Sequence, residues 1–418
     1  MAEGLQLHAL KSASAVRDIK LQPSFYRSHW LVGFGWNHNQ WVPAEFPDCK
    51  ILDAAFGKTP VFFSRVDGHA SWLNTAAITE LKNAGFDISK DPEGGRIGRL
   101  PDGEPSGLLF DSAHIKALAL LPDFSPAQHR LFFETSQKIF NRAGFTHVRD
   151  LSMNLAGWTL LRTMEEQKAL TVALDAFVTA EILSDLNRVF EEIQIIKADP
   201  SLQMRLHGVK IFIDGSLGSK TAHLSLPYTG ELHNGLLIWS FDDIKQALRR
   251  CWQAGLQIAI HTIGDQAAHL AVRAAREISA EGIAGRLHLE HVQCLRPETI
   301  QLMKPIHVTC YLQPCHWLSD HPWLRKDLPA ELLPYLFQWE QLRKNKIPFF
   351  FGSDSPIEPV SLFSTEKALR ESAAWGIPAL AAPWTNFHSH PDPTFCPSVT
   401  EIHDGRVIQV FFQNQPLL

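Results

Sequence analysis

The sequence lacks the features that would assign it to several special classes of protein. It has no apolar run near the ~18 residues needed to cross a bilayer, and its first twenty residues contain no apolar stretch of the secretory kind. Its 39 basic and 44 acidic side chains form no charged blocks, which argues against nucleic acid or an anionic membrane as a partner. Six cysteines scattered over 418 residues indicate reduced thiols in a cytoplasmic protein rather than a disulfide framework.

What the chain does contain is an ordinary share of core-forming residues. Hydrophobic residues make up 45% and charged residues 20% of the sequence, so a disordered chain is excluded. The 20 histidines and 12 tryptophans are the unusual counts. Histidine enrichment is a weak indication of metal or acid–base chemistry.

A regular alternation of helices and strands begins near residue 125. Ser125-Pro126-Ala127-Gln128 has the pattern of a capping box and predicts a helix that ends near Gly144. Further helices are expected from Ser240, Asp265 and Pro297, and one over 331–345. Seven largely apolar strands are expected between the helices, at 145–149, 171–178, 209–213, 256–260, 287–290, 308–312 and 347–351.

Strands that alternate with helices and are apolar on both faces indicate an α/β protein with a parallel sheet. Neither a GxGxxG nor a phosphate-binding loop follows a strand, which disfavours a doubly wound nucleotide-binding sheet. Polar residues instead stand at the carboxyl ends of several strands, as in a (β/α)8 TIM-type barrel. They are Asp150, Lys210, His261, His291 and Asp354.

The two ends of the chain do not share this rhythm. Residues 1–124 are rich in Trp, Gly and Pro, and we expect an insertion with some helix and a strand at 61–65. Residues 373–418 begin as a proline-rich loop and end in a predicted hairpin around His403-Asp404-Gly405.

His261 and His291 close successive strands that are predicted to be otherwise apolar, so two imidazoles could share a divalent metal. Each could equally be a histidine of the core or rim with satisfied hydrogen bonds. Lys210 lies inside a strand, and burial would lower its pKa and allow the neutral amine to form a metal-binding carbamate with carbon dioxide. The alternative is a lysine that reaches solvent or pairs with Asp214.

Asp354 follows three phenylalanines, where a carboxylate needs a partner charge, hydrogen bonds or a metal. It is a candidate for metal ligand and general base that accepts a proton from water. The segment Ser353-Asp354-Ser355-Pro356 also has the pattern of a helix N-cap, and the two roles are compatible.

The ordered set of segments resembles the amidohydrolase superfamily, in the amidohydrolase family 3 branch of N-substituted formamide deformylase-like enzymes. The resemblance covers about residues 30–360 and rests on GWNHNQW, RVDGHASWLN, DGEPSGLL, GFTHVRDL, GVKIFIDGSLGSKTA, IAIHTIGDQA, LHLEHVQ, LQPCHWLSD and FFFGSDSPIEP. It implies that Lys210 is a carbamylated or direct metal ligand, that His261 and His291 are ligands, and that Asp354 is ligand and general base. It further implies substrate contacts by a covering loop and by the seventh strand, through His69, Trp72, Gln313 and His316.

The family's first barrel strand ends in His-x-His, and no such motif precedes residue 30 here. The motif His388-Ser389-His390 comes after the eighth strand and is expected to be loop. We therefore expect a barrel without its first strand, from a chain shortened at its start, and a remnant of a small β-sandwich. The expected parts are 1–124 (an insertion between barrel strands one and two that covers the substrate), 125–372 (barrel strands two to eight) and 373–418 (loop and sandwich hairpin).

The resemblance implies a metal-dependent hydrolase of a non-peptide carbon–nitrogen bond, of the N-acyl amide or formamide type. The cofactor is expected to be one or two divalent metal ions, zinc first, with carbamylated Lys210, and His291 or His316 would stabilise the oxyanion. Two alternatives stay open: the same barrel with deamination or ester hydrolysis, and a shortened, catalytically impaired relative with a binding role or none. The expected partner is a small-molecule substrate, partly apolar or aromatic, and a homodimer stays open.

Overall fold

The computed structural model describes residues 4–377, 395–403 and 406–417. It divides into two compact units. Unit 1 runs to Phe132 and adds two short segments, Gly215–Ala222 and Gly235–Ile238; unit 2 contains the rest. The expected boundary near residue 124 stays a prediction, but the two added segments, which follow the Lys210 strand, were not foreseen.

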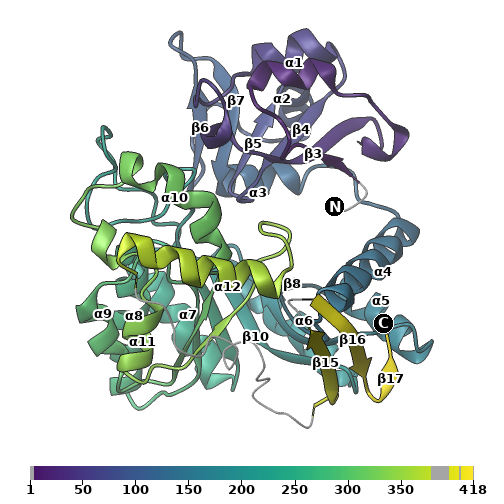
Figure 1. Ribbon diagram of the computed structural model, residues 1–418. Coiled ribbons are helices and arrows are strands. Elements are labelled where there is room, and N and C mark those ends of the chain that lie inside the picture. The colour runs from purple at the N-terminus through teal and green to yellow at the C-terminus, as the bar shows by residue number, and fades with distance from the viewer. Residues whose placement is uncertain (1–3, 378–394, 404–405, 418) are drawn as a thin grey trace. The chain divides into compact units, whose positions relative to one another are not determined.

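Unit 1 contains a seven-stranded mixed sheet of its own (Figure 1). The sequence predicted only one of its strands, 61–65, which the structure confirms as β4. The sheet order is β1-β3-β4-β5-β7-β6, with β2 paired to β3. Its strands are β1 (Leu5–Gln6), β2 (Tyr26–Arg27), β3 (Trp30–Trp36), β4 (Val61–Arg65), β5 (Ala70–Leu73), β6 (Gly95–Arg99) and β7 (Pro105–Asp111).

Alternation along β4 gives unit 1 a core on each face of this sheet. Phe62 packs in the cluster that includes α2 (Thr75–Asn83) and α3 (Ser112–Leu118). Val61 and Phe63 pack in the other cluster, with α1 (Cys49–Phe56), Trp36 of β3 and Trp72 of β5. Successive side chains of a strand point to opposite faces, so one short apolar strand can serve both cores.

Unit 2 contains the predicted parallel sheet. All seven expected strands are found, and every neighbouring pair is parallel. In sheet order they are β8 (His147–Met153), β9 (Ala173–Thr179), β10 (Met204–Phe212), β11 (Gln257–Thr262), β12 (Leu287–His291), β13 (Val308–Leu312) and β14 (Phe349–Phe351). Among the described residues β8 and β14 are the two open edges, so seven strands of a TIM-like α/β fold are present. The lack of a first strand stays a prediction.

The helices of unit 2 begin largely where the sequence predicts. Ser125 and Gln128 form the expected reciprocal capping contacts, and Ser240 accepts a hydrogen bond from the Asp243 N–H. The prediction of one continuous helix over 331–345 is wrong. A 3-10 turn (Leu333–Tyr335) and α11 (Trp339–Lys344) are found instead, because Pro334 supplies no N–H for helical hydrogen bonding. The helices are α4 (Pro126–Arg142), which begins in unit 1, α5 (Leu155–Glu166), α6 (Leu186–Ala198), α7 (Phe241–Gln253), α8 (Asp265–Ala280), α9 (Pro297–Met303), α10 (Cys315–Asp327), α11 (Trp339–Lys344) and α12 (Leu362–Glu371).

The carboxyl-terminal residues form the predicted hairpin. β15 (Ser398–His403) pairs antiparallel with β16 (Arg406–Phe412), and a third short strand, β17 (Gln415–Pro416), was not foreseen. The sandwich remnant stays a prediction, and His388-Ser389-His390 lies outside the described residues. All six cysteines are free and buried, as expected. In the described part of the chain, no helix is both long and apolar enough to cross a membrane.

Candidate functional site

Three predicted site residues lie at or near the carboxyl ends of β10, β11 and β12, and the two histidines among them are in contact. The register pairs Phe212 with His261 and Thr262 with His291. Both histidines therefore lie at the carboxyl ends of their strands, on the same side of the barrel mouth. Their rings lie edge to face with centroids 4.5 Å apart. Lys210, His261 and His291 are 1%, 2% and 8% exposed, so the site is a buried cluster of nitrogen donors.

Lys210 is buried, as one of the two sequence interpretations required, and the alternative of a side chain that reaches solvent is wrong. Burial lowers the pKa of its amine to about 8, while the nearby carboxylates, Glu290 foremost, act to raise it. The amine nitrogen lies 4.6 Å from the centre of the Phe212 ring. An amine with this pKa is partly neutral near pH 7, and the neutral form is the one that reacts with carbon dioxide.

Asp354 follows β14 and approaches the histidines through His316. Its Oδ2 lies 3.6 Å from His316 Nε2, and the His316 ring stacks on that of His291 with centroids 5.8 Å apart. The carboxylate is 37% exposed, more than a position after three phenylalanines suggested. The predicted helix N-cap is wrong, because Asp354 opens a turn in which its C=O accepts from the Ile357 N–H.

The buried carboxylate of Asp214, which the sequence analysis named only as a possible partner of Lys210, lies close to His261. Asp214 accepts hydrogen bonds from the backbone N–H groups of His223, Ile263 and Gly264. Its Oδ1 lies 3.7 Å from His261 Nε2. Asp214 therefore fixes the loop that follows β11 and places a negative charge near the His261 ring.

The donor set meets the requirements of a divalent metal only in part. Among the described residues, no three His, Cys, Asp or Glu side chains gather closely enough to hold a metal ion. Two neighbouring imidazoles do converge, however, and imidazole nitrogen is a preferred ligand of zinc. The Lys210 amine can add the missing oxygen donor by forming an N–C bond to carbon dioxide and releasing one proton. His261 and His291 therefore fit two ligands of a divalent metal, and the carbamate on Lys210 stays a prediction.

The parallel strands also carry polar side chains nearer their amino ends, although the sequence analysis expected largely apolar strands. Arg149 donates to both carboxylate oxygens of the buried Glu290, at 2.9 and 3.1 Å, and its guanidinium lies 3.5 Å from the centre of the Tyr311 ring. His207 pairs with Asp175 at 2.6 Å. The available signal is the strict polar–apolar alternation over 286–290, Arg-Leu-His-Leu-Glu, and the description of this strand as apolar was wrong.

A small recess lies beside His291. Its volume is about 10 Å³, room for about one water molecule, and its lining includes His291, Gln293, Gln313, Phe337, Gln338 and Trp339. The predicted substrate residue Gln313 is thus a neighbour of a predicted metal ligand. His316, the other predicted contact of this strand, lies on α10 and meets Asp354.

The predicted contacts from the first part of the chain lie in unit 1. His69 Nδ1 lies 2.8 Å from Oδ1 of the buried Asp111. Trp72 is fully buried among aromatic rings and donates its indole N–H to Asp48 O, so its position is that of a core residue. The roles of His69 and Trp72 in substrate binding stay predictions.

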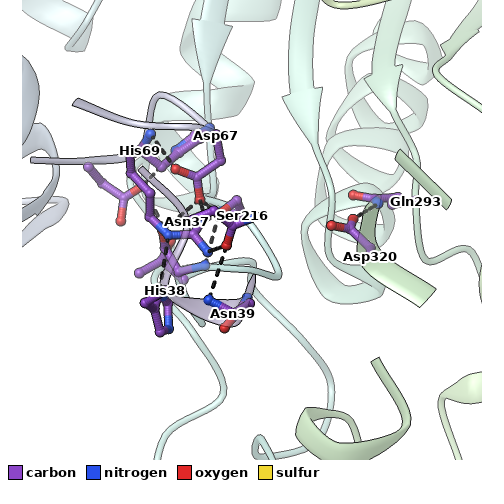
Figure 2. Close-up of polar contacts among 12 residues, drawn as sticks. Asn37, His38, Asn39, Asp67, His69, Ser216, Gln293 and Asp320 are labelled. Atoms are coloured by element: carbon purple, nitrogen blue, oxygen red, sulfur yellow. Dashed lines mark hydrogen bonds and ion pairs between the residues drawn. The ribbon is translucent and has the colours of Figure 1, made fainter. Parts of the chain in front are cut away.

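A buried carboxylate organises this part of unit 1. Asp67 accepts hydrogen bonds from Arg65, at 2.6 Å, from the hydroxyls of Ser216 and Ser219, and from the His69 backbone N–H (Figure 2). Burial alone would raise the pKa of Asp67, but Arg65 and the other donors outweigh it and hold the pKa well below its usual range. Ser216 and Ser219 belong to a segment that follows the Lys210 strand, so Asp67 fixes that segment within unit 1.

The sequence is similar to known proteins over most of its length. A family model described as "Amidohydrolase family" matches residues 8–369. The chain is 30% identical over 347 residues to Protein LONG AFTER FAR-RED 3 of Arabidopsis thaliana, covering 79% of this chain and 58% of that protein. It is also 30% identical over 374 residues to Putative amidohydrolase YtcJ of Bacillus subtilis, covering 85% of this chain and 67% of that protein.

Two solved structures support the fold. An uncharacterized metal-dependent hydrolase from Pyrococcus furiosus superposes with a TM-score of 0.62 at 24% identity, covering 88% of this chain and 72% of that one. Its counterpart from Pyrococcus horikoshii gives 0.64 at 23% identity, covering 90% and 72%. At these identities the similarity shows the fold alone.

Proposed function

The chain belongs to the amidohydrolase family, and on that premise we propose that it hydrolyses a non-peptide carbon–nitrogen bond in a small-molecule substrate. The substrate class is an N-acyl amide or formamide. One observation carries the proposal: Lys210, His261 and His291 are buried together where three parallel strands end. The carboxyl ends of barrel strands are where enzymes of this architecture place their reacting groups.

In the proposed site His261, His291 and the Lys210 carbamate hold a divalent metal, with zinc the first choice. Such a metal, when bound, polarises the substrate carbonyl and lowers the pKa of water to about 7. Asp214 positions His261 from behind, because its carboxylate lies 3.7 Å from Nε2. The burial of all three ligands excludes bulk water and strengthens each electrostatic contact.

Asp354 is the proposed general base. Its carboxylate is partly exposed and therefore able to accept a proton from water and later deliver it to the leaving nitrogen. His316 lies 3.6 Å away and can hold this carboxylate in place, or stabilise the oxyanion together with His291. These assignments divide proton transfer and charge stabilisation between β12, α10 and the turn after β14.

The decisive experiment combines metal analysis with hydrolysis assays. Purified protein should contain divalent metal and release benzylamine from N-formyl- and N-acetylbenzylamine after incubation with zinc and bicarbonate. Lys210→Ala and His261→Ala should each lose bound metal and reduce kcat/KM by at least about 100-fold, since loss of even outer-shell partners costs 10–100-fold. Two exposed residues provide matched controls, Lys197→Ala on α6 and His129→Ala on α4, which should retain both properties.

Three results would contradict the proposed function or the assignment of its site. A protein that holds only traces of metal and hydrolyses none of these amides would instead be an impaired relative. Hydrolysis that survives both Lys210→Ala and His261→Ala would show that the site assignment is wrong. Hydrolysis of benzyl acetate without hydrolysis of either amide would identify an esterase on the same barrel.

A further inference from the structure

Arg149 makes a polar contact that crosses the inner face of the sheet of unit 2. It lies on β8, and its Nη1 donates to both carboxylate oxygens of Glu290 on β12, at 2.9 and 3.1 Å, although β9, β10 and β11 lie between these strands. Neighbouring strands are about 4.8 Å apart, so β8 and β12 would be about 19 Å apart in a flat sheet. That gap is wider than the two side chains can span. The contact therefore requires a curved sheet with both side chains on its concave face.

The guanidinium of Arg149 is held by rings from both halves of the sheet. It lies 3.5 Å from the centre of the Tyr311 ring on β13 and 5.0 Å from that of the Phe177 ring on β9. Glu290 is 2% exposed, so little water competes for its carboxylate. The pair is thus a buried, well-surrounded connection between strands that share no backbone hydrogen bonds.

Another set of polar bonds on this face joins strands that are already neighbours. Asp175 on β9 pairs with His207 on β10, at 2.6 Å, and Gln257 on β11 contacts both His207, at 3.3 Å, and His288 on β12, at 2.6 Å. Backbone hydrogen bonds already fix the spacing of such neighbours, but they leave the curvature of the sheet open. In a closed barrel the strand number and stagger set the curvature, whereas β8 and β14 are open edges among the described residues. A contact from β8 to β12 supplies a constraint of this kind.

The end of β12 carries the constraint to His291. The backbone C=O of Glu290 accepts hydrogen bonds from the Val292 N–H, at 3.0 Å, and from the Thr262 hydroxyl, at 3.3 Å. These bonds lie where the backbone leaves the strand conformation, with φ of 72° at His291 and 43° at Val292. A Glu290 side chain that is held in place therefore holds the point at which the backbone turns His291 toward the neighbouring imidazole.

We propose that Arg149 is a positioning residue of the candidate metal site and acts through Glu290 as a strut between β8 and β12. The strut keeps the open sheet curved and holds the end of β12, so that His261 and His291 converge. The inference rests on the proposed function, because it takes these two histidines as metal ligands. Each ligand has to lie about 2.0–2.1 Å from zinc, so a looser sheet should bind metal more weakly.

The test removes the strut without leaving a buried charge behind. Arg149→Met/Glu290→Met is expected to fold, because apolar side chains of similar volume often replace a buried ion pair without loss of stability. The matched control is Arg249→Met/Glu281→Met. It removes a partly exposed pair of similar geometry, at 2.8 and 2.7 Å, between α7 and the end of α8.

Two measurements on metal-free protein report on the sheet and on the site. Nitroxide labels at Ser152→Cys on β8 and Gln301→Cys on α9, which follows β12, give a distance distribution by double electron–electron resonance. Both positions are exposed and the six native cysteines are buried, so labelling is selective. Titration of unlabelled protein with cobalt(II), followed by visible absorbance, gives a dissociation constant.

The double methionine variant should show a broader or shifted distance distribution and bind cobalt at least about tenfold more weakly, as expected when a residue that supports a ligand is lost. The control should match wild type in both measurements. An unchanged distance distribution would overturn the strut, and an unchanged cobalt affinity would overturn the positioning role.

If the double variant fails to fold, Glu290→Gln takes its place. Its amide offers Arg149 one accepting oxygen instead of two, so it should change both quantities in the same direction to a smaller extent. Wild-type values of either quantity in Glu290→Gln would overturn the inference.

The proposed function fails separately from the strut. Wild-type protein that binds no cobalt and hydrolyses no amide would refute that function, and the distance distribution, measured without metal, would still decide whether the strut holds the sheet. Amide hydrolysis by wild type, together with wild-type distances in the double variant, would refute the strut alone.

Discussion

Asp67→Asn removes the charge that compensates a buried arginine in unit 1. Arg65 is 2% exposed, and Asp67 Oδ2 lies 2.6 Å from its Nη1. An asparagine has nearly the same size and can still accept hydrogen bonds, but it leaves the guanidinium without a counter-charge. Breaking a buried ion pair by removal of one partner costs about 3–5 kcal/mol. The free energy of unfolding of unit 1 should fall by that amount at pH 7.

The same structure predicts how the effect depends on pH. The pKa of Asp67 is held well below its usual range in the folded state, whereas in the unfolded chain it is about 3.9. Stability from the carboxylate is therefore fully present above about pH 5 and is lost as the pH falls toward the folded-state pKa. The difference between wild type and Asp67→Asn should shrink steadily below pH 5.

Urea denaturation between pH 3.5 and 7, with hydrogen exchange read at the amides of β4 and β5, measures this difference in unit 1. Asp102→Asn, an exposed aspartate in the turn between β6 and β7, is the matched control and should match wild type. A loss below about 1 kcal/mol at pH 7, the value of an exposed ion pair, would refute the argument that the pair is buried and essential. A loss that does not change with pH would refute the depressed pKa.

Three further changes test unit 2. Arg149→Ala should cost about 3–5 kcal/mol in urea denaturation, because it removes the guanidinium that donates to both oxygens of the buried Glu290 carboxylate. Gly208→Ala should prevent β10 and β11 from pairing normally and reduce soluble yield, since the added Cβ would lie 1.9 Å from Gln257 O. Asp214→Ala should lower bound metal at least about tenfold by metal analysis, while a normal circular dichroism spectrum shows that the fold persists.

Local sequence signals predicted unit 2 well. Apolar runs bounded by caps and glycines located all seven strands, and the expected capping contacts at Ser125 and Ser240 are present. The placement of Lys210 was also predictable, because a lone lysine between apolar neighbours on a covered strand has to be buried or to reach the barrel mouth. These features depend on neighbours in sequence or on a single strand.

Features that depend on distant partners could not be predicted in the same way. The sheet of unit 1 is built from short strands, several of only two to five residues, that are separated by glycine-rich turns. The segment that contains Ser216 lies in unit 1, where Ser216 donates to Asp67, a residue 149 positions earlier in the chain. The turn after β14 exposes Asp354, although the preceding phenylalanines suggested burial.

The position of His291 follows from a break in strand alternation that its sequence does not show. His288 and Glu290 share one face of β12, and the register places His261 beside Glu290 on that same face. Continued alternation would direct His291 to the opposite face. Its φ of 72° instead places the backbone in the left-handed region, as does the φ of 43° at the β-branched Val292, where such a value is an outlier. The irregular backbone brings the centroids of the His291 and His261 rings to 4.5 Å from one another. Backbone conformations of this kind cost about 1–3 kcal/mol per residue, so the strain coincides with the point where the two imidazoles meet.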